Sequence, residues 1–145
     1  MDSTNYASVF VAVAEDRPVG VGTMPPERTP ASVARLQYDT LVDAPYRHTA
    51  DEVLFGVHAL RSGIPASDMA VARAAYFARG QPCLRSSPLA KRYGWGFHVD
   101  EQGRVALLAV GTARYDELVS DGSLTQRHAV SSGDGRATPL PIGGG

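Results

Sequence analysis

Residues 80 to 98, GQPCLRSSPLAKRYGWGFH, hold most of the side chains in this sequence that could carry out chemistry. They include the only cysteine, Cys83, and one of the four histidines, His98. A thiol among basic groups forms the nucleophilic thiolate more readily, and a histidine can serve as acid or base near neutral pH. The stretch therefore predicts a candidate catalytic pair in which Cys83 is the nucleophile and His98 is the acid or base.

Basic and hydroxyl side chains in the same region favour an anionic ligand. Five basic residues and no acidic residue lie between Met69 and Val99. The Ser87-Pro88 pair has the form of a helix start, whose free amide groups can hold an anion beside a bidentate arginine. We predict that the ligand-binding residues are Arg85, Ser86, Ser87, Lys91, Arg92, Tyr93 and Trp95.

Each of these residues also has a purely structural interpretation. A lone cysteine is often a small buried hydrophobe, and an N-cap serine already has a role in its own helix. His98 follows Gly94 and Gly96 on one face of an expected strand, where either a ligand or another part of the chain could approach. In the second case His98 would simply form a hydrogen bond to a backbone carbonyl, and the basic residues would form a solvated face.

The elements that would position this site can be inferred from local patterns. Residues 95–99 and 104–110, separated by DEQG, predict a β-hairpin, and the apolar run VFVAVA at 9–14 predicts a strand covered on both faces. Helices are expected from about Pro30 to Pro45, from the capping box Thr49-Ala50-Asp51-Glu52 to Gly63, and from about Ser67 to Arg79. A short helix is expected within residues 112–121.

This order of elements predicts an α+β fold with one domain. We expect residues 1–121 to form a small antiparallel sheet, made of the N-terminal strand and the C-terminal hairpin, packed with three or four helices. Residues 122–145 are rich in glycine, serine and proline and are expected to form a tail.

Composition excludes several classes of protein. The chain has 145 residues and a net charge of −1, so no overall positive charge attracts it to nucleic acid, and RNA binding is a minor hypothesis. Its apolar runs are too short to cross a membrane, and its first residues resemble no targeting signal, so a cytoplasmic location is expected. The four histidines lack compact ligand spacing, and no nucleotide-binding motif occurs, so we predict neither a metal nor a cofactor.

Three stretches together resemble a known family. They are VAED with the later proline pair, the Y-x-x-TADEVLF segment at 46–55, and the GQPCLRSSPLAKRYGWGFH run. These residues are similar to a family of short bacterial proteins described as domain of unknown function 6157, over about residues 4–120. The resemblance implies a free-standing bacterial cytoplasmic protein and supplies no activity, cofactor or catalytic residue.

Two hypotheses of different classes follow from the sequence. The first is a small ligand-binding protein, with or without enzymatic activity, that holds an anionic small molecule in a cleft built by residues 80–98. The second is a module without chemistry that docks on a partner protein or on a second copy of itself through an apolar patch that includes Trp95.

Overall fold

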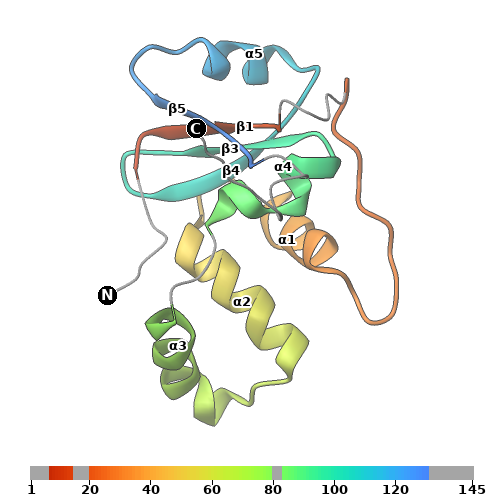
Figure 1. The fold of residues 1–145 in the computed structure, drawn as a ribbon, viewed down its shortest axis with the longest axis vertical. Coiled ribbons are helices and arrows are strands. Elements are labelled where there is room, and N and C mark those ends of the chain that lie inside the picture. Colours follow the sequence, from red (N-terminus) through yellow and green to blue (C-terminus); the bar gives the residue numbers. More distant parts are fainter. Residues whose placement is uncertain (1–6, 15–19, 80–82, 131–145) are drawn as a thin grey trace, which may run out of the picture.

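The computed structural model describes residues 7–14, 20–79 and 83–130. Figure 1 shows a sheet with one helix above it and a larger helical layer below it. The strand order within the sheet is β2-β4-β3-β1-β5.

Three strands form the centre of the sheet, as the sequence predicts. They are β1 (Val9–Ala12), β3 (Trp95–Val99) and β4 (Arg104–Ala109). All three are antiparallel to their neighbours in this group, and Phe97 lies opposite both Val11 and Leu107. Every residue of β1 is buried, which confirms that this strand is covered on both faces.

The fold is α+β, as predicted, but the sheet is larger than expected and it is mixed. A two-residue strand, β2 (His48–Thr49), pairs with β4, and β5 (Thr125–His128) pairs in parallel with β1. Strand β5 lies within the expected tail, so the sheet extends past the expected domain boundary at residue 121. Its side chains are exposed, and it therefore has no hydrophobic alternation that could have predicted it. Residues 131–145 of that tail lie outside the described residues.

One face of the sheet is covered by α1 (Val33–Leu41), α2 (Ala50–Ser62) and α4 (Pro88–Arg92). A short 3-10 helix, η2 (Leu84–Ser86), precedes α4. Leu84 and Leu89 are fully buried there in one core cluster with Leu41 of α1 and Phe97 of β3. Helix α5 (Ala113–Val119) covers the opposite face, where Tyr115 meets Phe10 edge to face.

Helix α3 (Met69–Ala78) is separated from the sheet by α2 (Figure 1). It follows another 3-10 turn, η1 (Ala66–Asp68), and Phe77 packs on Phe55 and Ala59 of α2. Helix α2 is therefore buried on two sides, against the main core and against α3.

Capping residues define where the helices begin. Thr49 and Glu52 form the predicted capping box at the start of α2, with hydrogen bonds of 3.2 and 2.9 Å. Ser87 caps α4 with Pro88 at its first turn, also as predicted. Helix α1 begins later than the expected position at Pro30, because Ser32 provides its N-cap.

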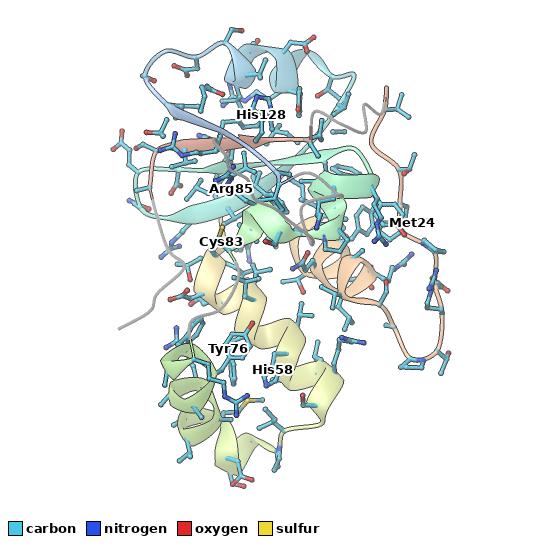
Figure 2. All side chains as sticks on the ribbon, viewed as in Figure 1. Met24, His58, Tyr76, Cys83, Arg85 and His128 are labelled. Carbon is cyan, nitrogen blue, oxygen red and sulfur yellow. The ribbon has the colours of Figure 1, made fainter. Side chains whose placement is uncertain are left out.

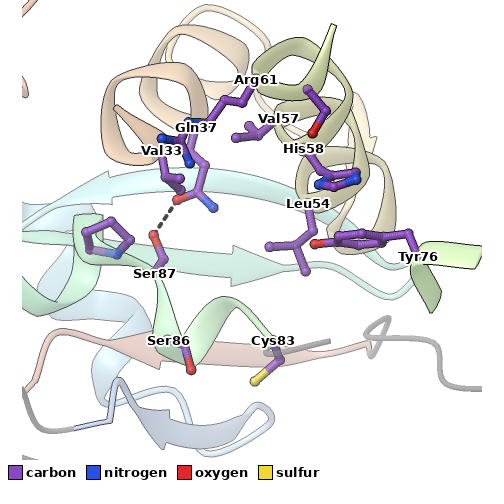
Figure 3. A pocket seen from close by; sticks show the side chains of 12 residues that line it. Val33, Gln37, Leu54, Val57, His58, Arg61, Tyr76, Cys83, Ser86 and Ser87 are labelled. Atoms are coloured by element: carbon purple, nitrogen blue, oxygen red, sulfur yellow. Dashed lines mark hydrogen bonds between the residues drawn. The ribbon is translucent and has the colours of Figure 1, made fainter. Parts of the chain in front are cut away.

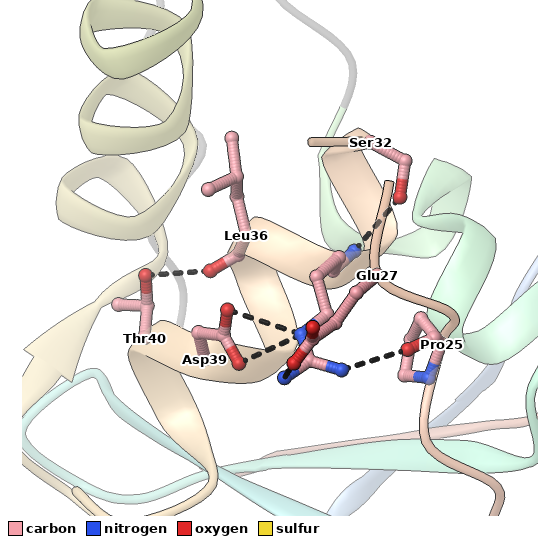
Figure 4. Close-up of polar contacts among 7 residues, drawn as sticks. Pro25, Glu27, Ser32, Leu36, Asp39 and Thr40 are labelled. Carbon is pink, nitrogen blue, oxygen red and sulfur yellow. Dashed lines mark hydrogen bonds and ion pairs between the residues drawn. The ribbon is translucent and has the colours of Figure 1, made fainter. Parts of the chain in front are cut away.

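Arg35 fixes the preceding loop against α1. Its guanidinium donates to the Pro25 carbonyl oxygen at 3.0 Å, to Glu27 at 3.2 Å and to Asp39 at 3.0 Å. Figure 4 shows these contacts gathered on one side of α1. The loop before α1 is thus held by one side chain that is only 14% exposed.

Within the described residues, no helix combines the length and the apolar character needed to cross a lipid bilayer.

Candidate functional site

The structure does not bring Cys83 and His98 together. Cys83 lies at the start of η2, next to Leu84 of the helix-covered core. His98 lies between Phe97 and Val99, which point into that core, so its own side chain points to the opposite face. Its strand partner there is Phe10, which packs under α5. A mechanism that pairs this thiol with this imidazole has no support in the geometry.

His98 instead has a polar partner from the loop before β2. The Tyr46 hydroxyl and His98 Nδ1 share a hydrogen bond of 2.7 Å, and the two rings meet edge to face. Burial lowers the pKa of His98, and the charge of Arg114 lowers it further. The lowered pKa favours the neutral imidazole at neutral pH.

The glycines before His98 leave no room for a ligand. A Cβ atom at Gly96 would lie 2.9 Å from both the Phe10 and the Tyr115 rings. At Gly94 a Cβ atom would overlap the Val21 carbonyl oxygen, so protein atoms already lie against both glycines.

The other residues of the predicted ligand-binding set are dispersed. Arg85 donates to the His128 carbonyl oxygen at 2.6 Å and so anchors η2 to the end of β5; Figure 2 shows these two residues close together. Trp95 donates to the Thr23 carbonyl oxygen at 2.8 Å and packs with Tyr93 against the core. The residues that line a cavity beside α2 do not include Arg85, Tyr93 or Trp95, nor do they include Lys91 and Arg92 of α4.

Ser87 has a structural role that occupies its hydroxyl. It is 3% exposed, it accepts from the Leu89 amide at 3.1 Å, and it donates to Gln37 Oε1 at 2.5 Å. The hydroxyl at this helix start therefore binds other parts of the protein, and α4 has only five residues.

A cavity of about 320 Å³ lies between α1, α2, α3 and the segment that leads into α4 (Figure 3). Its size is in the range of small-molecule sites. It is lined by Val33, Gln37, Leu54, Val57, His58, Arg61, Ser62, Tyr76, Cys83, Ser86, Ser87 and Pro88. Three predicted site residues, Cys83, Ser86 and Ser87, thus contribute to one wall.

The chemistry of the cavity comes mainly from residues outside the predicted set. Val33, Leu54 and Val57 form apolar walls. Arg61 lies among the lining residues, where no aspartate or glutamate is present. The charge of the lining is therefore positive only, which suits an anionic ligand.

An aromatic pair closes the side of the cavity toward α3. The rings of His58 and Tyr76 are stacked with their centroids 4.6 Å apart and an angle of 32° between them. Burial raises the pKa of Tyr76, and the buried carboxylate of Asp51 raises it further, so its hydroxyl stays protonated at neutral pH. Figure 2 shows this pair between α2 and α3.

Comparison with protein families settles the relationship that the three stretches of sequence suggest. A family of unknown function, DUF6157, matches residues 1–135. The chain belongs to this family. No curated protein and no solved structure matches it. The DUF6157 match reaches past residue 120, where the resemblance was expected to end, and so includes β5.

Among the cavity residues of this DUF6157 chain that were not predicted as site residues, five have polar side chains: Gln37, His58, Arg61, Ser62 and Tyr76. His58 and Arg61 follow Leu54 and Val57 along the face of α2 that lines the cavity, and spacing of about one turn is a signal that could have revealed them. Tyr76 comes from α3, and no local pattern relates α3 to α1.

The part of the DUF6157 chain that the structure describes contains no group of three or more His, Cys, Asp or Glu side chains placed to hold a metal ion. The cavity can therefore offer hydrogen bonds, one guanidinium and apolar contacts from its own residues.

Proposed function

We propose that this protein binds a small molecule with an apolar body and an anionic group in the cavity between α1, α2, α3 and the segment that leads into α4. The observation that supports it most directly is the combination of apolar walls with Arg61 and a buried amide, Gln37, in a lining without carboxylates. Apolar walls with a few placed polar groups are typical of small-molecule sites. This proposal keeps the anionic ligand inferred from the sequence and moves its site to a different set of residues.

The test is binding of simple apolar anions, octanoate and phenylacetate, followed by NMR of the methyl groups. We expect both probes to shift the signals of Val33, Leu54 and Val57. Replacing Arg61 by glutamine should weaken binding about fivefold, which is the effect of an exposed ion pair of about 1 kcal/mol.

Arg92→Gln is the matched control, because Arg92 is also exposed but does not line the cavity. It should leave the affinity unchanged. Weakening by Arg92→Gln and not by Arg61→Gln would favour the sequence-based site, and absence of any methyl shift with either probe would refute the proposal.

Self-association is a second candidate function, because α2 and α3 expose apolar side chains. Leu60 is 67% exposed, Val71 77% and Met69 36%. Trp95 is half-buried against Tyr38, so the patch expected around Trp95 is not the one that the fold presents. If copies associate through α3, the mass measured by light scattering should rise with concentration, and Val71→Glu should abolish that rise.

A bacterial, cytoplasmic setting remains a prediction from the sequence.

A further inference from the structure

The polar end of the cavity is set by a buried glutamine. Gln37 on α1 is 2% exposed, although the α-helical face on which it lies packs into the core. Its Oε1 accepts a hydrogen bond from Ser87 Oγ at 2.5 Å. Its amide nitrogen donates to no residue in the described part of the chain. Figure 3 shows this nitrogen on the side away from Ser87, facing the middle of the cavity.

The orientation of this amide follows from the hydrogen bonds of Ser87. The hydroxyl accepts from the Leu89 amide, and its single hydrogen is directed to Gln37 Oε1. If the amide of Gln37 were turned over, the hydrogen of Ser87 would have no acceptor among the described residues. The two hydrogen bonds, from Leu89 to Ser87 and from Ser87 to Gln37, thus hold the oxygen of Gln37 toward Ser87 and its NH₂ group toward the cavity.

A buried donor without a partner is costly, and a ligand atom that accepts its hydrogen bond removes that cost. We propose that Gln37 is the specificity-determining residue of the cavity and selects ligands that present an oxygen acceptor, as a carboxylate or a carbonyl, to its amide nitrogen. The inference rests on the proposed function and deepens it, because it states which ligand atom is recognised and by which residue. An ammonium group at the same place also carries only donors, so it cannot form a hydrogen bond with the NH₂ group and binds weakly.

Three probes of equal chain length test this inference: octanoate, octanamide and octylammonium. We expect the wild-type protein to bind octanoate and octanamide and to bind octylammonium at least about tenfold more weakly, since an unpaired buried polar group changes affinity by about ten- to a hundredfold. The affinities are measured by calorimetry, and methyl NMR shifts of Val57 locate the probe in the cavity.

Gln37→Glu should reverse the preference. Ser87 can still donate to one carboxylate oxygen, and the other oxygen then faces the cavity as an acceptor. The affinity for octanoate should fall at least about tenfold, and octylammonium should bind more tightly than it does to the wild type. Gln102→Glu is the matched control, because it makes the same change of charge on an exposed turn outside the cavity and should leave all three affinities unchanged.

Gln37→Met serves if the glutamate variant does not fold, since methionine has a similar length and no hydrogen-bonding group. It should lower the ratio of octanoate affinity to octylammonium affinity by about three- to tenfold, the effect of losing one neutral hydrogen bond, and it should leave the part of that ratio that Arg61 contributes. An unchanged preference in either folded variant would overturn the inference while the proposed function stands. If octanoate binds in the cavity and octylammonium binds equally well to the wild type, the inference also fails. If no probe shifts the Val57 methyl signals, the proposed function fails as well.

Discussion

Two valines on the same face of α2 allow a direct test of whether there is free space beside Val57. Val53 and Val57 are one turn apart, and they are 1% and 4% exposed. Val53 belongs to the packed core beneath the sheet, whereas Val57 lines the cavity. The same substitution, valine to leucine, should therefore have opposite effects at the two positions.

The expected magnitudes follow from the space around each side chain. At Val57 the added methylene group enters the cavity and gains about 0.8 kcal/mol of buried apolar surface. At Val53 it must displace packed neighbours, which costs about 1–3 kcal/mol. The small gain in helix propensity from valine to leucine is the same in both variants and cancels in the comparison. The two variants should therefore differ by about 2–4 kcal/mol in the free energy of unfolding.

Urea unfolding followed by circular dichroism measures this difference. With a slope of about 2 kcal/mol per molar urea, the two midpoints should lie about 1–2 M apart, with the wild type between them. Val57→Leu should also weaken octanoate, because its side chain occupies part of the site. If both variants lower the midpoint equally, Val57 has no free space beside it, and the cavity as described is refuted.

Three further predictions concern residues outside the cavity. Gly94 has a φ of 80°, and a Cβ atom there would overlap the Val21 carbonyl oxygen, so Gly94→Ala should lower the free energy of unfolding by about 1–3 kcal/mol in urea titrations. The lowered pKa of His98 means that the unfolded chain binds its proton more readily, so this contribution to stability is complete above about pH 6.5 and is lost as the pH falls through the pKa of the folded state. Urea midpoints measured between about pH 7.5 and pH 5 should therefore fall less in His98→Gln than in the wild type, and equal slopes would contradict this assignment. Because Cys83 and His98 lie on opposite faces of the sheet, His98→Ala should leave the rate of Cys83 alkylation by iodoacetamide within about twofold of the wild type, and a larger drop would restore the catalytic pair.

The parts of the fold that were predicted most accurately are those whose sequence motifs span only a few neighbouring residues. The capping box at Thr49, the Ser87-Pro88 start of α4 and the β-hairpin all involve neighbours in sequence, and the structure confirms them. Strand β5 could not be predicted, because its side chains are exposed and its pairing with β1 joins segments more than a hundred residues apart. Parallel pairing of this kind leaves no local pattern.

Helix α1 shows why the site was harder to predict than the fold. Val33, Leu36 and Leu41 recur at roughly helical spacing, but of these three only Leu41 is buried, together with Ala34 and Gln37. A glutamine at a core position does not fit a hydrophobic pattern, so apolar spacing alone could not identify Gln37 as a buried residue. The partner that makes its burial tolerable, Ser87, is fifty residues away in sequence and could not be inferred from spacing.

The serine motif in the 80–98 segment is nevertheless what connects sequence and site. As a helix start it was expected to offer its hydroxyl and amide groups to an anion directly. In the structure the Ser87 hydroxyl accepts from α4 and passes its hydrogen to Gln37, and the donor that reaches the cavity is the glutamine amide. The motif therefore acts indirectly: Ser87 orients Gln37, and the amide nitrogen of Gln37 is the donor that faces the cavity. If a ligand binds in the cavity as proposed, Ser87 would affect which ligands fit without touching them, because a reversed Gln37 amide would present an acceptor in place of a donor.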